Sequence, residues 1–130
     1  MIERVNPAEL ATPSGFSHAA RVSGGTVVHL AGQTGMDADG RIVAGGIVAQ
    51  FEQALANLLT ALRAAGGAPA DLARVTVYIV DVPAYKANAR EIGAVWRRLA
   101  GRDYPAMAGI GVARLWDDDA LVEIDGVAYV

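Results

Sequence analysis

The carboxylates of Glu123 and Asp125 are the side chains of this sequence best placed to do chemistry. Glu123 stands within ALVEIDGV, one of the most apolar runs of the chain, and a buried carboxylate is costly unless something pairs with it or uses it. Asp125 follows two residues later, so in a strand both side chains share one face and each charge raises the other's pKa. The two carboxylates therefore predict an acid and a base, unless one of them pairs with Arg114 or Arg21 in a purely structural role.

Asn88 and the segment after Tyr104-Pro105 are the next candidates. Asn88 falls on the apolar face of a predicted helix, where a buried amide needs either a neighbouring loop or a ligand as its partner. Strand alternation places Met107, Gly109 and Gly111 on one face, and the two glycines let a backbone, a partner chain or a ligand approach closely. Packing against another subunit is the favoured use of this face.

The remaining candidates point away from cofactor chemistry. His18 and His29 are the only histidines and their spacing matches no metal motif. Ser17 lacks the G-x-S-x-G frame of a nucleophile elbow, and Gly109-Ile110-Gly111 lacks the third glycine of a dinucleotide fingerprint. We therefore predict no metal, nucleotide or flavin, and no cofactor of any other kind.

The first half of the chain predicts a hairpin followed by a helix. HAARVS and TVVHLAG are strand-like runs joined at Gly24-Gly25, a pattern typical of a β-hairpin. Residues 33–46 predict a loop or a short extra strand at 41–43. Apolar residues then repeat at helical spacing and predict a helix over residues 47–65, ended by Gly66-Gly67; they are Phe51, Leu55, Leu58, Leu59 and Leu62.

The second half predicts a strand over 74–80, a helix over 83–100, and strands over 106–114 and 120–130. The resulting order, ββαβαββ, indicates an α+β domain with a mixed sheet, both helices on one face and at least one parallel strand pair. The last two strands are apolar on both sides of their alternation. Another copy of the chain is therefore expected to cover the open sheet face.

Composition bounds the class of protein. The chain has 130 residues, of which 53% are hydrophobic and 19% charged, with no cysteine and a net charge of −3. These values predict a single folded domain over residues 1–130 and fit a cytoplasmic location, while the negative charge argues against binding to nucleic acid. The N-terminus does not read as a signal peptide and no apolar run approaches the ~18 residues of a membrane span.

Several motifs together resemble the RidA/YjgF family, also known as the endoribonuclease L-PSP family. PSGFSHAARV is similar to the family's G-P-Y-S-Q-A segment, LAGQTGMD to S-G-Q-x-P-x-D, and the spacing of Gln53, Asn57 and Leu58 to Q-x-x-x-N-L. RVTVYIVDVPAYKANAREIGAVW resembles the family's strand and helix block, and VARLWDDDALVEIDGVA its V-A-x-L-P-x-x-A-L-V-E-I-E-A-I-A ending. The last match is the most specific.

The resemblance implies a chorismate mutase-like fold and a homotrimer whose sheets form a central barrel. It also implies three clefts at subunit interfaces that hydrolyse enamines and imines without a cofactor, releasing ammonia and a 2-keto acid. In such clefts an arginine holds the substrate carboxylate, and a glutamate with a backbone carbonyl positions the attacking water.

The implied site residues carry over in part. Glu123 matches the catalytic glutamate, Asn88 the cleft asparagine and Gly32 the backbone of the S-G-Q loop, and Gly109 belongs to the same set of substrate-binding positions. Met107 replaces the arginine of P-A-R and Phe16 replaces the tyrosine of G-P-Y-S; Arg114 aligns elsewhere. A thioether offers no grip on a carboxylate and a phenyl ring has no hydroxyl.

These differences shape the expected function. We expect a small-molecule hydrolase or deaminase that acts on an enamine, imine or amide-like metabolite, with a less anionic and more apolar ligand than its relatives and weak or absent activity on 2-imino acids. The alternative is a non-catalytic trimer that binds a metabolite for regulation. Ribonuclease activity has little support in an acidic chain.

Overall fold

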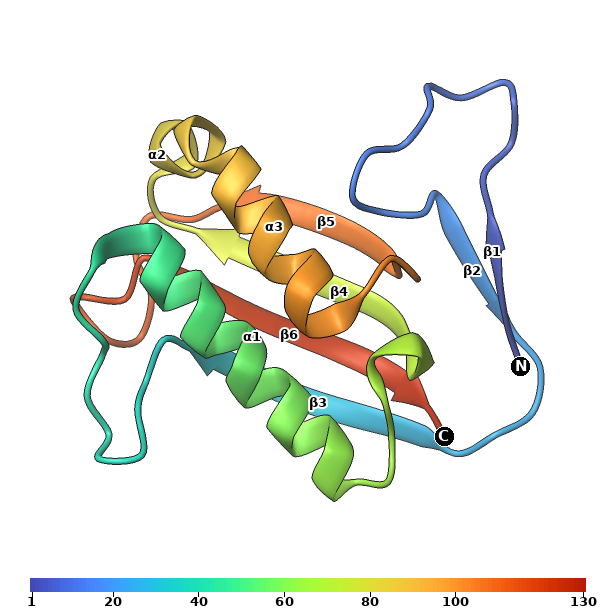
Figure 1. Ribbon diagram of the computed structural model, residues 1–130, viewed down its shortest axis with the longest axis horizontal. Coiled ribbons are helices and arrows are strands. Elements are labelled where there is room, and N and C mark those ends of the chain that lie inside the picture. Colours follow the sequence, from blue (N-terminus) through green and yellow to red (C-terminus); the bar gives the residue numbers. More distant parts are fainter.

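The computed structural model describes residues 1–130 as a four-stranded sheet with helices on one face and a separate two-stranded ribbon (Figure 1). The strands are β1 (Ile2–Val5), β2 (Ala19–Val22), β3 (Val27–Thr34), β4 (Leu72–Ile79), β5 (Ala106–Gly111) and β6 (Val122–Tyr129). The helices are α1 (Gly46–Ala64), α2 (Val82–Ala87) and α3 (Ala89–Ala100), with a 3-10 turn at Pro69–Asp71. None of the helices combines the length and apolar character that a membrane span requires.

The main sheet has the strand order β3-β6-β4-β5. β4 and β5 are parallel and are connected through α2 and α3, whereas the other neighbouring pairs are antiparallel. α1 packs over β3 and β6, and α3 lies beside α1 on the same face of the sheet (Figure 1). The predicted α+β architecture, parallel pair and shared helix face are therefore confirmed.

The core lies between α1 and the sheet. The apolar stripe that predicted this helix is buried along its whole length, and Phe51, Leu55, Leu58, Leu59 and Leu62 are each at most 2% exposed. The helix ends close to the predicted boundary because the chain turns at Gly66, whose φ of 91° is the left-handed conformation that favours glycine.

The predicted hairpin around Gly24-Gly25 was wrong. β2 pairs with β1, a strand that the sequence pattern did not reveal, and β3 pairs with β6. The residues beside the turn bond to the two ends of the chain: Ser23 N donates to Met1 O at 3.0 Å, and Thr26 N donates to Val130 O at 2.7 Å. The two strands therefore leave the turn toward different sheets instead of pairing with each other.

The predicted helix over 83–100 is two helices. Of the loop or short strand expected at 41–43, the structure has the loop, with one bridge between Met36 and Ile42. The break falls at Asn88, whose φ of −108° and ψ of 16° depart from helical values. Its side chain bonds back to the first of the two helices, as Asn does when it competes with the backbone.

The sheet face opposite the helices carries partly exposed side chains. In β6 the residues alternate strictly between buried and half-buried, so Ile124 belongs to the core whereas Val127 and Tyr129 do not. The last three residues of β5 are exposed. Within one chain these strands are thus buried on one face only. Their apolar patterns predict burial on both faces, which requires a further layer that covers the open face.

Candidate functional site

Glu123 lies in β6 on the sheet face that the helices leave uncovered. Its neighbour Ile124 is fully buried, whereas Glu123 is half-buried. The register of β3 shifts between Leu30 and Gln33, and this irregularity brings Gly32 against the carboxylate: a Cβ on Gly32 would lie 2.9 Å from Cδ of Glu123. A glycine at the bulge therefore lets the backbone of β3 approach the carboxylate closely.

Asp125 and Tyr78 complete this group on the uncovered face. The Tyr78 hydroxyl donates a hydrogen bond of 3.2 Å to Oδ2 of Asp125. Desolvation raises the pKa of Glu123, and the charges of Asp125 and Asp117 raise it further. The charge of Asp125 and its hydrogen bond raise the pKa of Tyr78. Glu123 is thus a carboxylate that takes up a proton more readily than an ordinary glutamate.

No arginine neutralises either carboxylate. Arg114 pairs with Asp118 at 2.6 Å, and Arg21 pairs with Glu3 in the N-terminal ribbon. The structural pairing considered from the sequence is therefore not the arrangement found. No three His, Asp or Glu side chains come together as a ligand set for a metal ion.

Gln50 of α1 holds the segment that leads into β6. Its side chain is 5% exposed; Oε1 accepts a hydrogen bond of 2.8 Å from Leu121 N, and Nε2 donates one of 3.1 Å to Asp119 O. Sequence reasoning missed this residue. The available signal was a polar side chain on the buried stripe, three residues after Ile47 and four before Ala54.

Phe16 is fixed beside the start of β5. The neighbouring Ser17 donates from its backbone N to Pro105 O at 2.9 Å and from Oγ to Tyr104 O at 2.8 Å. The Phe16 ring meets His18 edge-on, with the ring centroids 5.2 Å apart. Ser17 therefore acts as an anchor for this segment, in keeping with its lack of a nucleophile motif.

Met107 faces the helix side of the sheet, because it pairs in register with the buried Val75 of β4. Gly109 pairs in the same way with Val77. A cavity of about 680 Å³ opens on this side between β5, α3 and the loop at 13–15, and Met107 forms part of its wall. The volume lies within the usual range for small-molecule sites, ~300–1,000 Å³.

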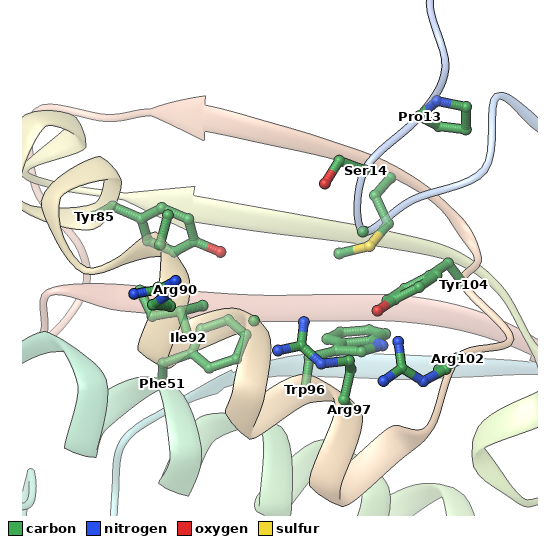
Figure 2. A pocket seen from close by; sticks show the side chains of 14 residues that line it. Pro13, Ser14, Phe51, Tyr85, Arg90, Ile92, Trp96, Arg97, Arg102 and Tyr104 are labelled. Carbon is green, nitrogen blue, oxygen red and sulfur yellow. The ribbon is translucent and has the colours of Figure 1, made fainter.

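Two aromatic pairs line the cavity. Tyr85 meets Phe51 with ring centroids 6.1 Å apart, and Trp96 stacks on Tyr104 at 6.3 Å. Figure 2 shows the Tyr85 hydroxyl pointing into the space between the two pairs. Burial raises the pKa of Tyr85 to about 12, so this hydroxyl stays protonated and able to donate at neutral pH.

Asn88 lies at the junction of α2 and α3. Its Nδ2 donates a hydrogen bond of 2.8 Å to Ala84 O, so one of the partners that its amide needs comes from the preceding helix. Asn88 itself does not line the cavity that Met107 lines, whereas the next residue, Ala89, does.

A single chain does not bring the two groups of candidate residues together. Glu123 and Gly32 lie on the uncovered face at the β3 side of the sheet, whereas Met107 and Gly109 lie on the helix side of β5. β4 lies between β6 and β5 in the sheet, so the strands that carry the two groups are about 10 Å apart. The two groups also lie on opposite faces of the sheet.

The fold of this chain recurs in known proteins. The family model described as endoribonuclease L-PSP matches residues 7–130. The chain belongs to this family. A crystal structure of a Rid family protein from Yersinia pestis, YyfB, whose function is described as unknown, matches the Rid fold seen here with a TM-score of 0.88 and 38% identity, covering 99% of this chain and 98% of that one.

Curated relatives of this Rid family member include proteins described by family and by activity. A RutC family protein of Pyrococcus horikoshii is 33% identical over 86% of this chain and 86% of its own. The 2-iminobutanoate/2-iminopropanoate deaminase of Capra hircus is 33% identical over 78% of this chain and 71% of its own.

Proposed function

We propose that this Rid family protein hydrolyses small imines, enamines or related C=N compounds, that it works without a cofactor, and that it acts as a homotrimer. Relatives described as 2-iminobutanoate/2-iminopropanoate deaminases support the reaction class. The observation that carries the proposal is Glu123, a half-buried carboxylate with a raised pKa that lies against the backbone of Gly32 and takes part in no ion pair.

Glu123 supplies the proton chemistry of this reaction. Its carboxylate holds a water molecule and accepts a proton as the water oxygen adds to the carbon of the C=N bond. The C–N bond then breaks and the nitrogen leaves as ammonia, so an imine and water give a carbonyl compound and ammonia. A raised pKa suits a group that takes up a proton and returns it to the leaving nitrogen.

The homotrimer supplies the complete cleft. Val127 and Tyr129 on the uncovered face are half-buried in one chain, and the last three residues of β5 are exposed. Both features support contact with a second copy. In the trimer, the β5 edge of one chain, which carries Met107, lies against the uncovered sheet face of the next chain, which carries Glu123. This contact brings the two groups of candidate residues into one cleft. The oligomer is tested by sedimentation equilibrium, where the expected mass is three times the chain mass of 13.5 kDa and a monomer contradicts the proposal.

The reaction is tested with 2-iminobutanoate and 2-aminoacrylate generated in situ, following the release of keto acid and ammonia. We expect slow turnover that Glu123→Gln abolishes, because the amide cannot accept the proton. Equal rates for both proteins remove Glu123 from the mechanism. Ligands that raise the Tm while no substrate is turned over favour the alternative, a non-catalytic metabolite-binding trimer.

The role of Met107 has its own test. Restoring a guanidinium with Met107→Arg adds a charge-assisted bond to a substrate carboxylate, which is worth roughly tenfold or more in kcat/KM. Met107→Lys is the control, because it restores the charge without the planar fork. An unchanged kcat/KM for Met107→Arg contradicts the idea that position 107 limits activity on 2-imino acids.

A further inference from the structure

Three arginines reach the cavity beside β5, and no acidic side chain lines it. Arg90 and Arg97 come from α3, and Arg102 follows that helix. The chain as a whole has a net charge of −3, so a wall with three positive charges and no negative one departs from the general surface. In Figure 2, Arg97 and Arg102 lie on either side of Trp96, and Arg90 lies near Tyr85.

None of these three guanidinium groups has an ion-pair partner in the chain. The ion pairs of the protein use Arg21, Arg98 and Arg114 instead. Arg98 shows what a structural arginine does on the same helix, because it pairs with Glu52 of α1. Unpaired guanidinium groups gathered beside apolar walls are suited to binding the carboxylate or phosphate of a ligand.

Gly93 leaves room for one of these arginines. A glycine inside a helix costs about 1 kcal/mol relative to alanine, so its use there needs a reason. A Cβ on Gly93 would lie 3.2 Å from Nη1 of Arg97, and both residues line the cavity. A side chain at Gly93 would therefore crowd the Arg97 guanidinium, which lies close to the backbone of α3.

Trp96 adds a flat apolar surface and an unused donor. Its ring is nearly parallel to that of Tyr104, with an interplanar angle of 25°. Trp96 is 5% exposed, and its Nε1 is buried without a hydrogen-bond partner, although a buried indole N–H normally has one. Met107 lines the cavity from β5 and adds to its apolar surface.

We propose that this cavity binds an organic anion that carries an apolar, unsaturated body. Arg97 and Arg102 bind the anionic head, and the body lies over Trp96, Tyr104 and Met107. As a statement about substrate, the inference rests on the proposed function: the substrate keeps its negative charge, but holds it at a distance from the reacting C=N group. The positive charge that position 107 lacks is then supplied from α3 and the segment after it.

Binding is measured through Trp96. The chain has two tryptophans, and the other, Trp116, is 92% exposed, so Trp116→Phe leaves Trp96 as the only reporter. The trimeric protein is titrated with 3-phenylpropionate, with its uncharged amide and with inorganic phosphate. We expect 3-phenylpropionate to change the Trp96 fluorescence and to bind at least tenfold more tightly than either of the other two probes.

Arginine variants locate the anionic head. Arg97→Gln and Arg102→Gln are each expected to weaken 3-phenylpropionate binding at least tenfold, whereas Arg98→Gln, which removes the same charge from the same helix outside the cavity, should leave it within about twofold. Equal losses in all three variants overturn the site, because a general loss of positive charge then explains them. Equal affinity for the amide overturns the anionic head, and equal affinity for phosphate overturns the apolar body.

The two claims have separate readouts, because turnover depends on Glu123, whereas 3-phenylpropionate binding depends on Arg97 and Arg102. If the arginine variants bind normally while Glu123→Gln abolishes turnover, the anion site falls and the proposed function stands. If binding depends on Arg97 and Arg102 but the wild type turns over no imine, the proposed function falls and the anion site stands.

Discussion

Replacing Gln50 with leucine should destabilise the protein through the segment that precedes Glu123. The side chain of Gln50 makes two hydrogen bonds to backbone groups, at Asp119 O and Leu121 N, and is itself buried. Leucine has a similar volume but leaves both backbone groups without that partner. Each lost bond costs about 1 kcal/mol, so we expect a loss of about 2 kcal/mol in the free energy of unfolding.

Urea unfolding at one fixed protein concentration measures this loss, since the stability of an oligomer depends on concentration. The matched control is Gln53→Leu in the same helix, because Gln53 is only half-buried. Its side chain makes one hydrogen bond, to Asn57 Oδ1 at 2.8 Å, and such a pair on a helix contributes about 0.3 kcal/mol. A difference of less than about 0.5 kcal/mol between the two variants, the scale of a single weak pair, contradicts this role of Gln50.

Three further outcomes follow from the structure. Burial raises the pKa of Glu123 in the folded protein, so Glu123→Gln should be more stable than wild type at pH 8. Thermal melts should show that this gain in stability disappears below about pH 4, because the carboxyl is then protonated in both the folded and the unfolded chain. Gly32→Ala should displace the Glu123 carboxylate, which lies where the new Cβ would be, and so lower turnover while leaving the Tm nearly unchanged. Leu58→Ala removes a fully buried side chain of α1 and should cost about 2–5 kcal/mol in urea unfolding; a cost below 1 kcal/mol contradicts this account of the core.

The parts of the fold that depend on local patterns were predictable. The buried stripe of α1 repeats at helical spacing, and β4 and β6 are apolar runs of strand length, so their positions follow from periodicity. The hairpin at Gly24-Gly25 was not predictable in the same way. Glycines indicate that the chain turns, but the partners of Ser23 and Thr26 are Met1 and Val130, which no local pattern can identify.

The candidate site was also predictable only in the parts that local sequence patterns specify. Glu123 could be found because a carboxylate in an apolar strand is costly, and its face was known from strand alternation. Its contact with Gly32 depends on a shift of register in β3, which strand periodicity does not encode. Arg90 and Arg97 did leave a signal, because a spacing of seven residues places them two turns apart on one face of a helix.

Position 107 shows why a single matched residue is a poor guide to the charge of a site. The presence of Met107 in place of an arginine predicts a ligand with less negative charge, and that argument considers one side chain. The cavity around Met107 is lined by three arginines that lie elsewhere in the sequence and have no acidic neighbours there. An anionic ligand of the kind we propose experiences the summed field of these groups, so the loss of one guanidinium at position 107 does not by itself fix the charge of the ligand.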